Sequence, residues 1–180
     1  VGRCSLGGLD VAEDGRTLYV MNLFDRTLYA VALSAGAKAP TRQHVTAIPV
    51  PDPRFKGGEF RPFAVKCYEG KVYVGVVGDA SHSQKSSDLR ASVLELDPAT
   101  RRFRTVFTTR LDYPRGRLAY GEGAWHAWSD DFDRMICPQA DGWVVYPQPI
   151  LSDIEFDTDG SMVLAFMDRL GHQAGTGQFH

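Results

Sequence analysis

The chain is poor in several features that usually reveal a function. It has only three cysteines among 180 residues, Cys4, Cys67 and Cys137, and no Cys-x-x-Cys pair, which excludes a disulfide framework and a structural zinc site. Asn22 is the only asparagine and does not begin an Asn-x-Ser/Thr pattern, so the chain has no N-glycosylation acceptor. No apolar run approaches the roughly 18 residues of a membrane helix. The sequence therefore predicts no membrane span.

The chain also lacks an excess of one charge and the common catalytic motifs. Twenty Lys and Arg residues against 22 Asp and Glu residues give a formal net charge of −2, which disfavours a nucleic-acid partner. The five histidines show no metal-ligand spacing, and neither a Gly-x-Ser-x-Gly elbow nor a phosphate-binding Gly-x-x-x-x-Gly-Lys loop occurs. We therefore predict no catalytic residue and no cofactor, with a divalent cation as the alternative left open.

What the chain does contain is apolar alternation with a period of two. Short stretches rich in β-branched and aromatic residues, each bounded by turn formers, indicate strands. They lie at Leu18–Met21, Leu28–Leu33, Lys71–Val77 and Ser92–Leu96. The sequence predicts an all-β protein.

Three tight turns mark an internal repeat. Asp14-Gly15, Glu69-Gly70 and Asp159-Gly160 each separate two apolar strands. In the first two units a loop and two further strands follow. Four antiparallel strands in a unit of this size predict the blade of a β-propeller. The strands before the three turns, 9–12, 62–68 and 152–157, are then the equivalent innermost strands.

The repeat divides the chain into two blades at about 5–50 and 60–110, an insertion at about 112–148 and a partial third blade at about 149–180. Because propellers close with four to eight blades, this ring is incomplete. We expect the remaining blades from the rest of the protein or from another chain. The insertion spaces Trp125, Trp128, Phe132 and Ile136 as one helical stripe, so we expect it to be partly helical or irregular and docked on the blades.

Two strings resemble known families. Glu13–Asn22, followed by Thr27–Val31, resembles the YVTN-type β-propeller repeat of bacterial and archaeal surface proteins. Tyr146–Asp157, together with Leu111–Gly116, resembles the propeller region of large bacterial cell-surface proteins that often carry Sdr-type B-like domains. The resemblance implies a secreted or cell-surface location in a bacterium. It implies a fold and carries no catalytic motif.

Loop length distinguishes the two ends of the predicted blades. The strand-one to strand-two turns are minimal, whereas 51–61, 79–88 and the insertion are long, and long loops inside a compact fold are usually functional. We call the end with these loops the long-loop face and expect ligands there. The Asp-Arg pairs on it are interpreted first as loop-pinning turns, and the tryptophans first as docking residues. The candidate interaction residues are Arg61, Asp88, Arg115, Trp125, Trp128, Asp168 and Arg169.

A second candidate site is a central channel lined by the innermost strands. Period two places Asp153 and Glu155 on one face of a strand and Ile154 on the other. Asp10, Lys66 and Arg61 are expected to approach the same region from neighbouring blades. Because these charges differ in sign, we predict a water-filled or salt-bridged channel and no tight metal site.

Two classes of function follow. The first is a non-enzymatic recognition or scaffolding propeller that binds a protein or glycan through the long-loop face. The alternative is a metal-dependent propeller hydrolase of the gluconolactonase or regucalcin type, with a cation in the channel. A propeller fold hosts both classes, so the fold alone does not choose between them.

Overall fold

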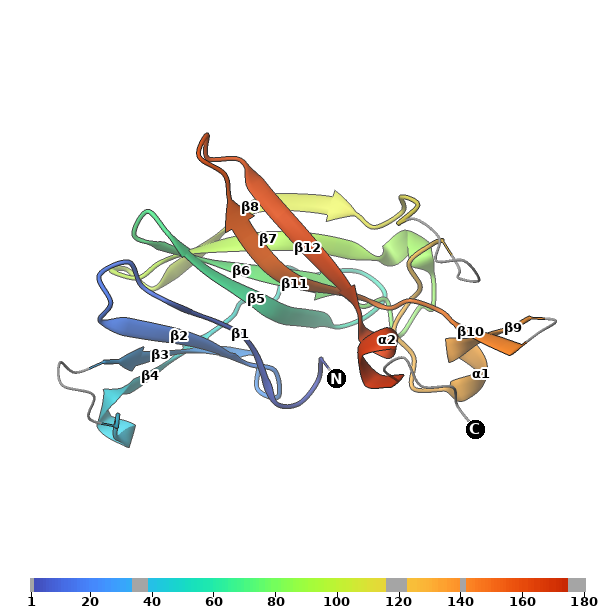
Figure 1. The fold of residues 1–180 in the computed structure, drawn as a ribbon, viewed down its shortest axis with the longest axis horizontal. Coiled ribbons are helices and arrows are strands. Elements are labelled where there is room, and N and C mark those ends of the chain that lie inside the picture. Colours follow the sequence, from blue (N-terminus) through green and yellow to red (C-terminus); the bar gives the residue numbers. More distant parts are fainter. Residues whose placement is uncertain (1, 34–38, 116–122, 140–141, 175–180) are drawn as a thin grey trace.

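The protein is built from antiparallel β-strands, as a computed structural model shows (Figure 1). The structure describes residues 2–33, 39–115, 123–139 and 142–174. Small antiparallel sheets account for most of these residues, so the predicted all-β class is confirmed.

Two sheets have four strands and two have two strands. The first sheet has the order β1-β2-β3-β4 and the second β5-β6-β7-β8. The two smaller sheets pair β9 with β10 and β11 with β12. The strands are β1 Leu6–Val11, β2 Thr17–Asn22, β3 Thr27–Ala32, β4 Val45–Pro49, β5 Phe60–Tyr68, β6 Lys71–Gly78, β7 Arg90–Asp97, β8 Arg102–Arg110, β9 Ile136–Gln139, β10 Gly142–Val145, β11 Pro149–Phe156 and β12 Met162–Asp168. The helices are two 3₁₀ turns at Arg42–His44 and Ser86–Asp88, α1 Phe132–Met135 and α2 Arg169–Ala174.

β1, β5 and β11, which are the first strands of three sheets, share a local geometry. Gly15, Gly70 and Gly160 close the turns after β1, β5 and β11 with positive φ angles of 68°, 70° and 82°, a conformation that glycine adopts without steric cost. β1, β5 and β11 also each carry a one-residue register shift against the next strand. A bulge at the same place in each strand supports the internal repeat that the sequence predicts.

The sheets are stacked, with β5–β8 between β1–β4 and β11–β12 (Figure 1). One core lies between β1–β4 and β5–β8 and includes Met21, Leu28 and Val74. The second lies between β5–β8 and β11–β12 and includes Val93 and Ile154. β6 and β7 of the middle sheet are therefore buried on both faces, which explains their nearly continuous apolar runs.

The described part of the insertion includes an irregular stretch and a short helix, as predicted, but its four apolar residues do not form one helical stripe. Its backbone from Ala124 to Asp131 is irregular, and α1 spans only four residues. Trp125 and Trp128 lie in the irregular stretch, so the helix-like spacing of the four apolar residues does not correspond to one helix. The β9–β10 hairpin that follows was not predicted. Both tryptophans are buried against the sheets, as the docking interpretation requires.

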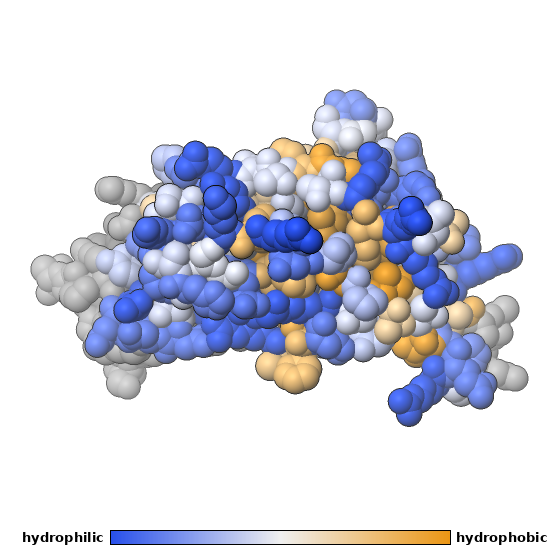
Figure 2. All heavy atoms as spheres, turned by 180° about the vertical axis from the view of Figure 1, so that it is seen from behind, coloured by the Kyte–Doolittle hydropathy of each residue, from blue (hydrophilic) through white to orange (hydrophobic). Residues whose placement is uncertain are grey.

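Hydrophobic side chains also reach the surface. Seen from behind, the molecule is mostly hydrophilic, with hydrophobic residues gathered right of centre (Figure 2). The exposed large hydrophobic residues include Leu9 and Val11 of β1 and Val163 of β12. Within the described ranges, no helix is long and apolar enough to cross a membrane.

Gly75 tests the packing of the middle sheet on β11. A Cβ at this position would lie 2.7 Å from Cγ of Leu151 and 2.9 Å from Cβ of Ala64. We expect Gly75→Val to destabilise the fold by about 1–3 kcal/mol through overpacking, measured by urea denaturation. Ala165→Val is the matched control, because Ala165 also lies opposite a bulge but is exposed. Equal effects of the two substitutions would contradict the described packing.

Candidate functional site

The loops of the long-loop face meet where β5 begins and β6 ends. Glu59 precedes β5 and Asp79 follows β6, and each backbone N–H binds the other residue: Asp79 N–H donates to the Glu59 carbonyl at 2.9 Å, and Glu59 N–H donates to the Asp79 carboxylate at 2.8 Å. Gly58 permits this approach, because a Cβ there would lie 2.3 Å from Oδ1 of Asp79. The strand ends are thereby fixed to each other.

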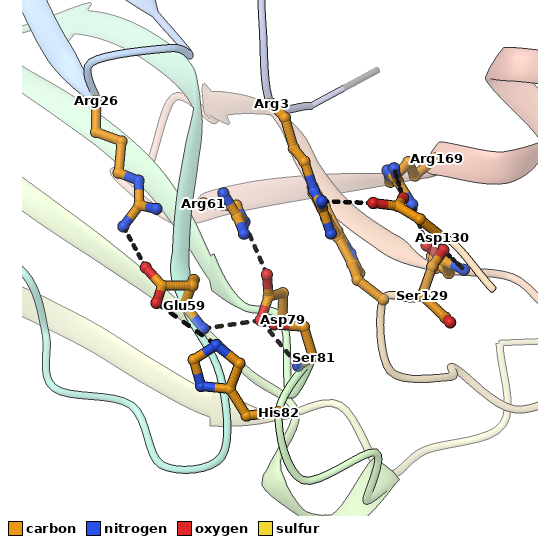
Figure 3. Close-up of polar contacts among 12 residues, drawn as sticks. Arg3, Arg26, Glu59, Arg61, Asp79, Ser81, His82, Ser129, Asp130 and Arg169 are labelled. Carbon is orange, nitrogen blue, oxygen red and sulfur yellow. Dashed lines mark hydrogen bonds and ion pairs between the residues drawn. The ribbon is translucent and has the colours of Figure 1, made fainter.

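Asp79 is a fully buried carboxylate with a complete set of donors. Its Oδ1 also accepts the Ser81 N–H at 2.9 Å, and its Oδ2 accepts Nε–H of Arg61 at 2.7 Å (Figure 3). Burial alone would raise the pKa of Asp79, but the hydrogen bonds from Ser81, Arg61 and Glu59 outweigh it and lower the pKa. The side chain therefore stays ionised and anchors the loop.

A second ion pair stands beside the first. Arg26, from the turn after β2, donates to the Glu59 carboxylate at 2.7 Å, and Nε2 of His82 lies 3.6 Å from the same group (Figure 3). The hydrogen bond from Arg26 lowers the pKa of Glu59. Glu59 thus links the first sheet to the loop that follows β6.

Trp128 fastens the insertion to this cluster. Its backbone N–H donates to the Asp79 carbonyl at 2.9 Å, and its indole Nε1–H donates to the Pro149 carbonyl at 2.9 Å. The guanidinium groups of Arg61 and Arg169 lie over the indole ring, at 5.5 and 4.8 Å from its centroid. With 0% of its surface exposed, Trp128 is unavailable to a ligand on the face.

The guanidinium of Arg169 is also buried and is hydrogen-bonded within the protein. It donates to Oε1 of Gln148 at 2.6 Å and to Asp130 at 2.8 Å, and Asp130 also accepts from Arg3 at 2.5 Å (Figure 3). Burial alone would raise the pKa of Asp130, but Arg169, Arg3 and Arg61 together lower it. Arg169 is a structural residue and not a free ligand-binding charge.

The remaining predicted face residues do not join this cluster. Asp168 accepts the backbone N–H groups of Gln148 and Leu170, at 3.0 and 2.9 Å, so it fixes the start of α2. This agrees with the turn-forming interpretation of the Asp-Arg pairs. Arg115 lies over the Trp125 ring, 5.1 Å from its centroid, away from Trp128. Asp88 lines a separate cavity.

That cavity has a volume of about 350 Å³ and opens between the 51–59 loop and the outer part of β5–β8. Phe55 holds the loop in place by packing over Gly78, where a Cβ would lie 2.6 Å from the ring. The cavity combines three basic residues, three hydroxyl groups and one carboxylate. Its lining residues are Pro53, Arg54, Phe55, Lys56, Asp88, Arg90, Ser92, Thr105 and Thr108.

Arg54 and Lys56 are the available charges of the cavity. Both are exposed, and neither forms an ion pair with another described residue. Arg90 is held by its own loop, because it donates to the carbonyls of Ser87 and Leu89 at 2.7 and 2.8 Å. Two free cations beside hydroxyl groups form a surface that can bind an acidic group.

Sequence reasoning missed this cavity. The sequence indicated the long loop 51–61 as a binding segment, but Arg61 was the only candidate residue chosen within it. The ion pair that occupies Arg61 could not be foreseen, because its buried partner Asp79 is not marked by any local sequence pattern. The available signal was the presence of two basic residues, Arg54 and Lys56, on either side of Phe55 in a long loop.

The predicted channel residues lie close together, with one exception. Lys66 and Glu155 form an ion pair at 2.6 Å, and Asp10 accepts the Cys67 N–H at 2.8 Å. The hydrogen bond to Glu155, with the charges of Asp10 and Asp153, raises the pKa of Lys66. The expected approach of Arg61 is wrong, because its guanidinium is bound to Asp79 at the end of the sheet.

No described group of three or more His, Cys, Asp or Glu side chains is arranged to hold a metal ion. The buried thiol of Cys67 is not a nucleophile at neutral pH. Burial, followed by the charges of Asp10 and Glu13, raises its pKa to about 12.

Asp79→Asn tests the role of the buried carboxylate. Arg61 would lose its charged partner in a nearly buried site, so we expect a loss of about 3 kcal/mol at pH 7. Asp79 has a lowered folded pKa, so its stabilisation is present above its unfolded pKa near 3.8 and is lost as the pH falls through the folded value. The difference between wild type and variant in urea midpoints should therefore shrink at low pH.

Asp112→Asn is the control, because Asp112 forms an exposed pair with Arg110 at 2.9 Å and should change stability by less than about 1 kcal/mol. A pH-independent difference for Asp79→Asn would contradict the assigned ionisation.

The chain matches three curated proteins of Dictyostelium discoideum. It is 29% identical to Colossin-C over 178 residues, 28% identical to Colossin-A over 178 residues and 26% identical to Colossin-B over 188 residues. These matches cover 95%, 95% and 93% of this chain but only 16%, 2% and 4% of the three relatives. No family model and no solved structure matches the chain.

These relatives correct one expectation. Dictyostelium is a eukaryote, so the bacterial source and the bacterial cell-surface location implied by the sequence resemblance are overturned. The likeness to a YVTN-type repeat is separate from that location and stays a prediction. The chain is similar to a small part of very long proteins.

Proposed function

We propose that the stacked sheets are blades of a β-propeller and that the chain is a non-enzymatic recognition module. The repeated turn, the repeated bulge and the repeated stacking of one sheet on the next support the blades. The ring is incomplete in this chain, and its remaining blades come from further polypeptide.

The observation that carries the recognition function is the basic cavity of the long-loop face. Arg54 and Lys56 are exposed without an ionic partner, while the neighbouring charges Arg61, Asp79 and Arg169 are consumed in holding the loops. The buried charges therefore hold the loops in place, and the two exposed cations remain accessible to a ligand. A rigid loop with free cations loses little conformational entropy on binding.

The ligand we propose is an acidic group on a protein or glycan. The guanidinium of Arg54 suits a carboxylate, and the exposed hydroxyl of Thr105 suits a polar atom beside it. The hydroxyls of Ser92 and Thr108 bind each other at 2.8 Å. Asp88, the one acid of the lining, disfavours a multiply charged ligand deep in the cavity. The alternative, a metal-dependent hydrolase, has no specific observation in its favour among the described residues.

Charge reversal tests the binding function. We expect the double variant Arg54→Glu and Lys56→Glu to weaken binding of an acidic probe at least tenfold, because two attractions become repulsions. The probes are a hexaglutamate peptide and an oligogalacturonate, measured by biolayer interferometry at low and high salt. The peptide arm and the sugar arm separate a protein ligand from a glycan.

The control for this experiment is the double variant Arg16→Glu and Arg102→Glu. It changes the net charge equally, but both residues are exposed near the short turns at the other end of the sheets. Unchanged binding is expected. The proposal fails if neither probe binds, or if both double variants lose binding equally.

Asp153→Asn tests the alternative function. Asp153 is exposed and accepts the backbone N–H of Ile154 at 2.9 Å. A structural role predicts a loss of less than about 1 kcal/mol and no change of melting temperature on calcium addition before or after substitution. A calcium-dependent rise in melting temperature that disappears in the variant would instead favour the hydrolase.

A further inference from the structure

The outer face of sheet β1–β4 is apolar and uncovered. Most paired positions in β1, β2 and β3 that point away from the first core are apolar or aromatic, and none of these belongs to either core. The polar pair Asn22 and Thr27 lies at one end of this side of the sheet. We call this set the open face: Leu9, Val11, Leu18, Val20, Tyr29 and Val31. An apolar surface on one side of a sheet is typical of an interaction site.

The repeat shows what covers such a face elsewhere in this molecule. Leu9 pairs with Val20, and its register equivalents are Val65, which pairs with Val74, and Ile154, which pairs with Leu164. Leu9 is 59% exposed, whereas Val65 is 4% and Ile154 0% exposed. The same position is therefore buried wherever a preceding sheet stands in front of it.

The covering surface is also defined. The face of β5–β8 that contains Val65 packs on the inner face of β1–β4, which carries Tyr19, Met21 and Leu28. The open face carries apolar side chains at the register positions that Val65 and Val74 occupy in β5–β8. We therefore expect it to pack on a surface like the one formed by Tyr19, Met21 and Leu28. Its occupant needs alternating large apolar residues on a flat antiparallel sheet.

The backbone permits the same close contact. Where β1 meets β5, a Cβ on Gly8 would lie 2.8 Å from the Phe63 carbonyl oxygen and 2.8 Å from the Val65 nitrogen. Neighbouring first strands thus touch through their backbones. A sheet on the open face would place its own first strand beside β1 in this manner.

We propose that the open face binds a further four-stranded antiparallel sheet of the same repeat, which packs through its equivalent of the Tyr19, Met21 and Leu28 surface. This inference rests on the proposed blades and is independent of the acidic ligand. A second copy of the chain fits less well. Asp10, Lys66 and Glu155 occupy equivalent register positions in β1, β5 and β11, and Lys66 pairs with Glu155 across the second interface. If the β11–β12 face of a second copy packed on β1 in the same way, this ion pair would be replaced by two acids, Glu155 and Asp10.

The test is a tandem variant of the full chain in which residues 1–58 are duplicated at the amino end. The duplicated 50–58 segment then leads into β1 much as the original one leads into β5. Leu9→Cys is introduced in the original copy, with Cys4→Ser and Cys137→Ser as background. The measurement is the rate at which a maleimide labels the new thiol in the single and tandem proteins.

We expect the tandem protein to slow labelling of Leu9→Cys at least tenfold. Val163→Cys is the matched control, because Val163 is 58% exposed on β12 at the far side of the stack and should label equally fast in both proteins. Val11→Cys repeats the test in case Leu9→Cys does not fold. Equal labelling of the open-face thiols in both proteins would overturn the proposal.

Two other outcomes also decide the question. Protection of Leu9→Cys in the single chain that grows with protein concentration would assign the face to a second copy and would overturn the proposal. Acidic-probe binding by the same tandem protein is measured in parallel. Loss of that binding with full protection of Leu9→Cys would refute the recognition function and leave this inference standing.

Discussion

The structure depends on the burial of one sheet between two others. β5–β8 contributes Val72, Val74 and Leu94 to one core and Val77 and Val93 to the other, so β6 and β7 are apolar on both sides. At about 25 cal/mol per Å² of apolar surface, this two-sided burial dominates the stabilisation of the fold. The loops at the end of this sheet have fixed starting points, because the strands that they connect cannot move without disturbing both cores.

The buried charges serve a purpose different from that of the cores. Asp79, Arg61 and Arg169 lie where strand ends, the insertion and α2 meet. Asp79 accepts the backbone N–H groups of Glu59 and Ser81, and the two arginines donate to the side chains of Asp79 and Gln148. Such pairs add little net free energy compared with apolar residues, but breaking one is costly. They therefore define one arrangement of irregular segments that apolar packing alone leaves underdetermined.

Much of the fold was predictable because its signals are local. Period two and the Asp-Gly turns indicated the strands of both large sheets, and the match of 13–15 with 69–70 indicated the repeat. The path of the insertion was not predictable, because Trp125 and Trp128 are positioned by Asp79 and Pro149, which are distant in sequence. The helical spacing of its apolar residues was a coincidence of tertiary docking.

The residues of the candidate sites also fall into those that local sequence patterns predict and those that they do not. Lys66 and Glu155 were placed together correctly, because strand alternation fixes the side of the sheet that each occupies. Arg61 was misplaced, because the choice between Asp79 and the channel depends on where β5 begins relative to the end of β6. Arg54 and Lys56 were overlooked, because a cavity formed by a loop folded over a sheet has no sequence pattern of its own.

The close contact at Gly8 has a geometric consequence. β1 and β5 touch through their backbones, whereas farther out the 51–59 loop, and not the first sheet, faces Ser92 and Thr108 across the cavity. Each sheet with its side chains is therefore a wedge, thin at the first strand and thick at the fourth. In the proposed propeller, identical wedges laid in sequence would rotate by a constant angle, so the taper of one interface would set how many units complete the ring.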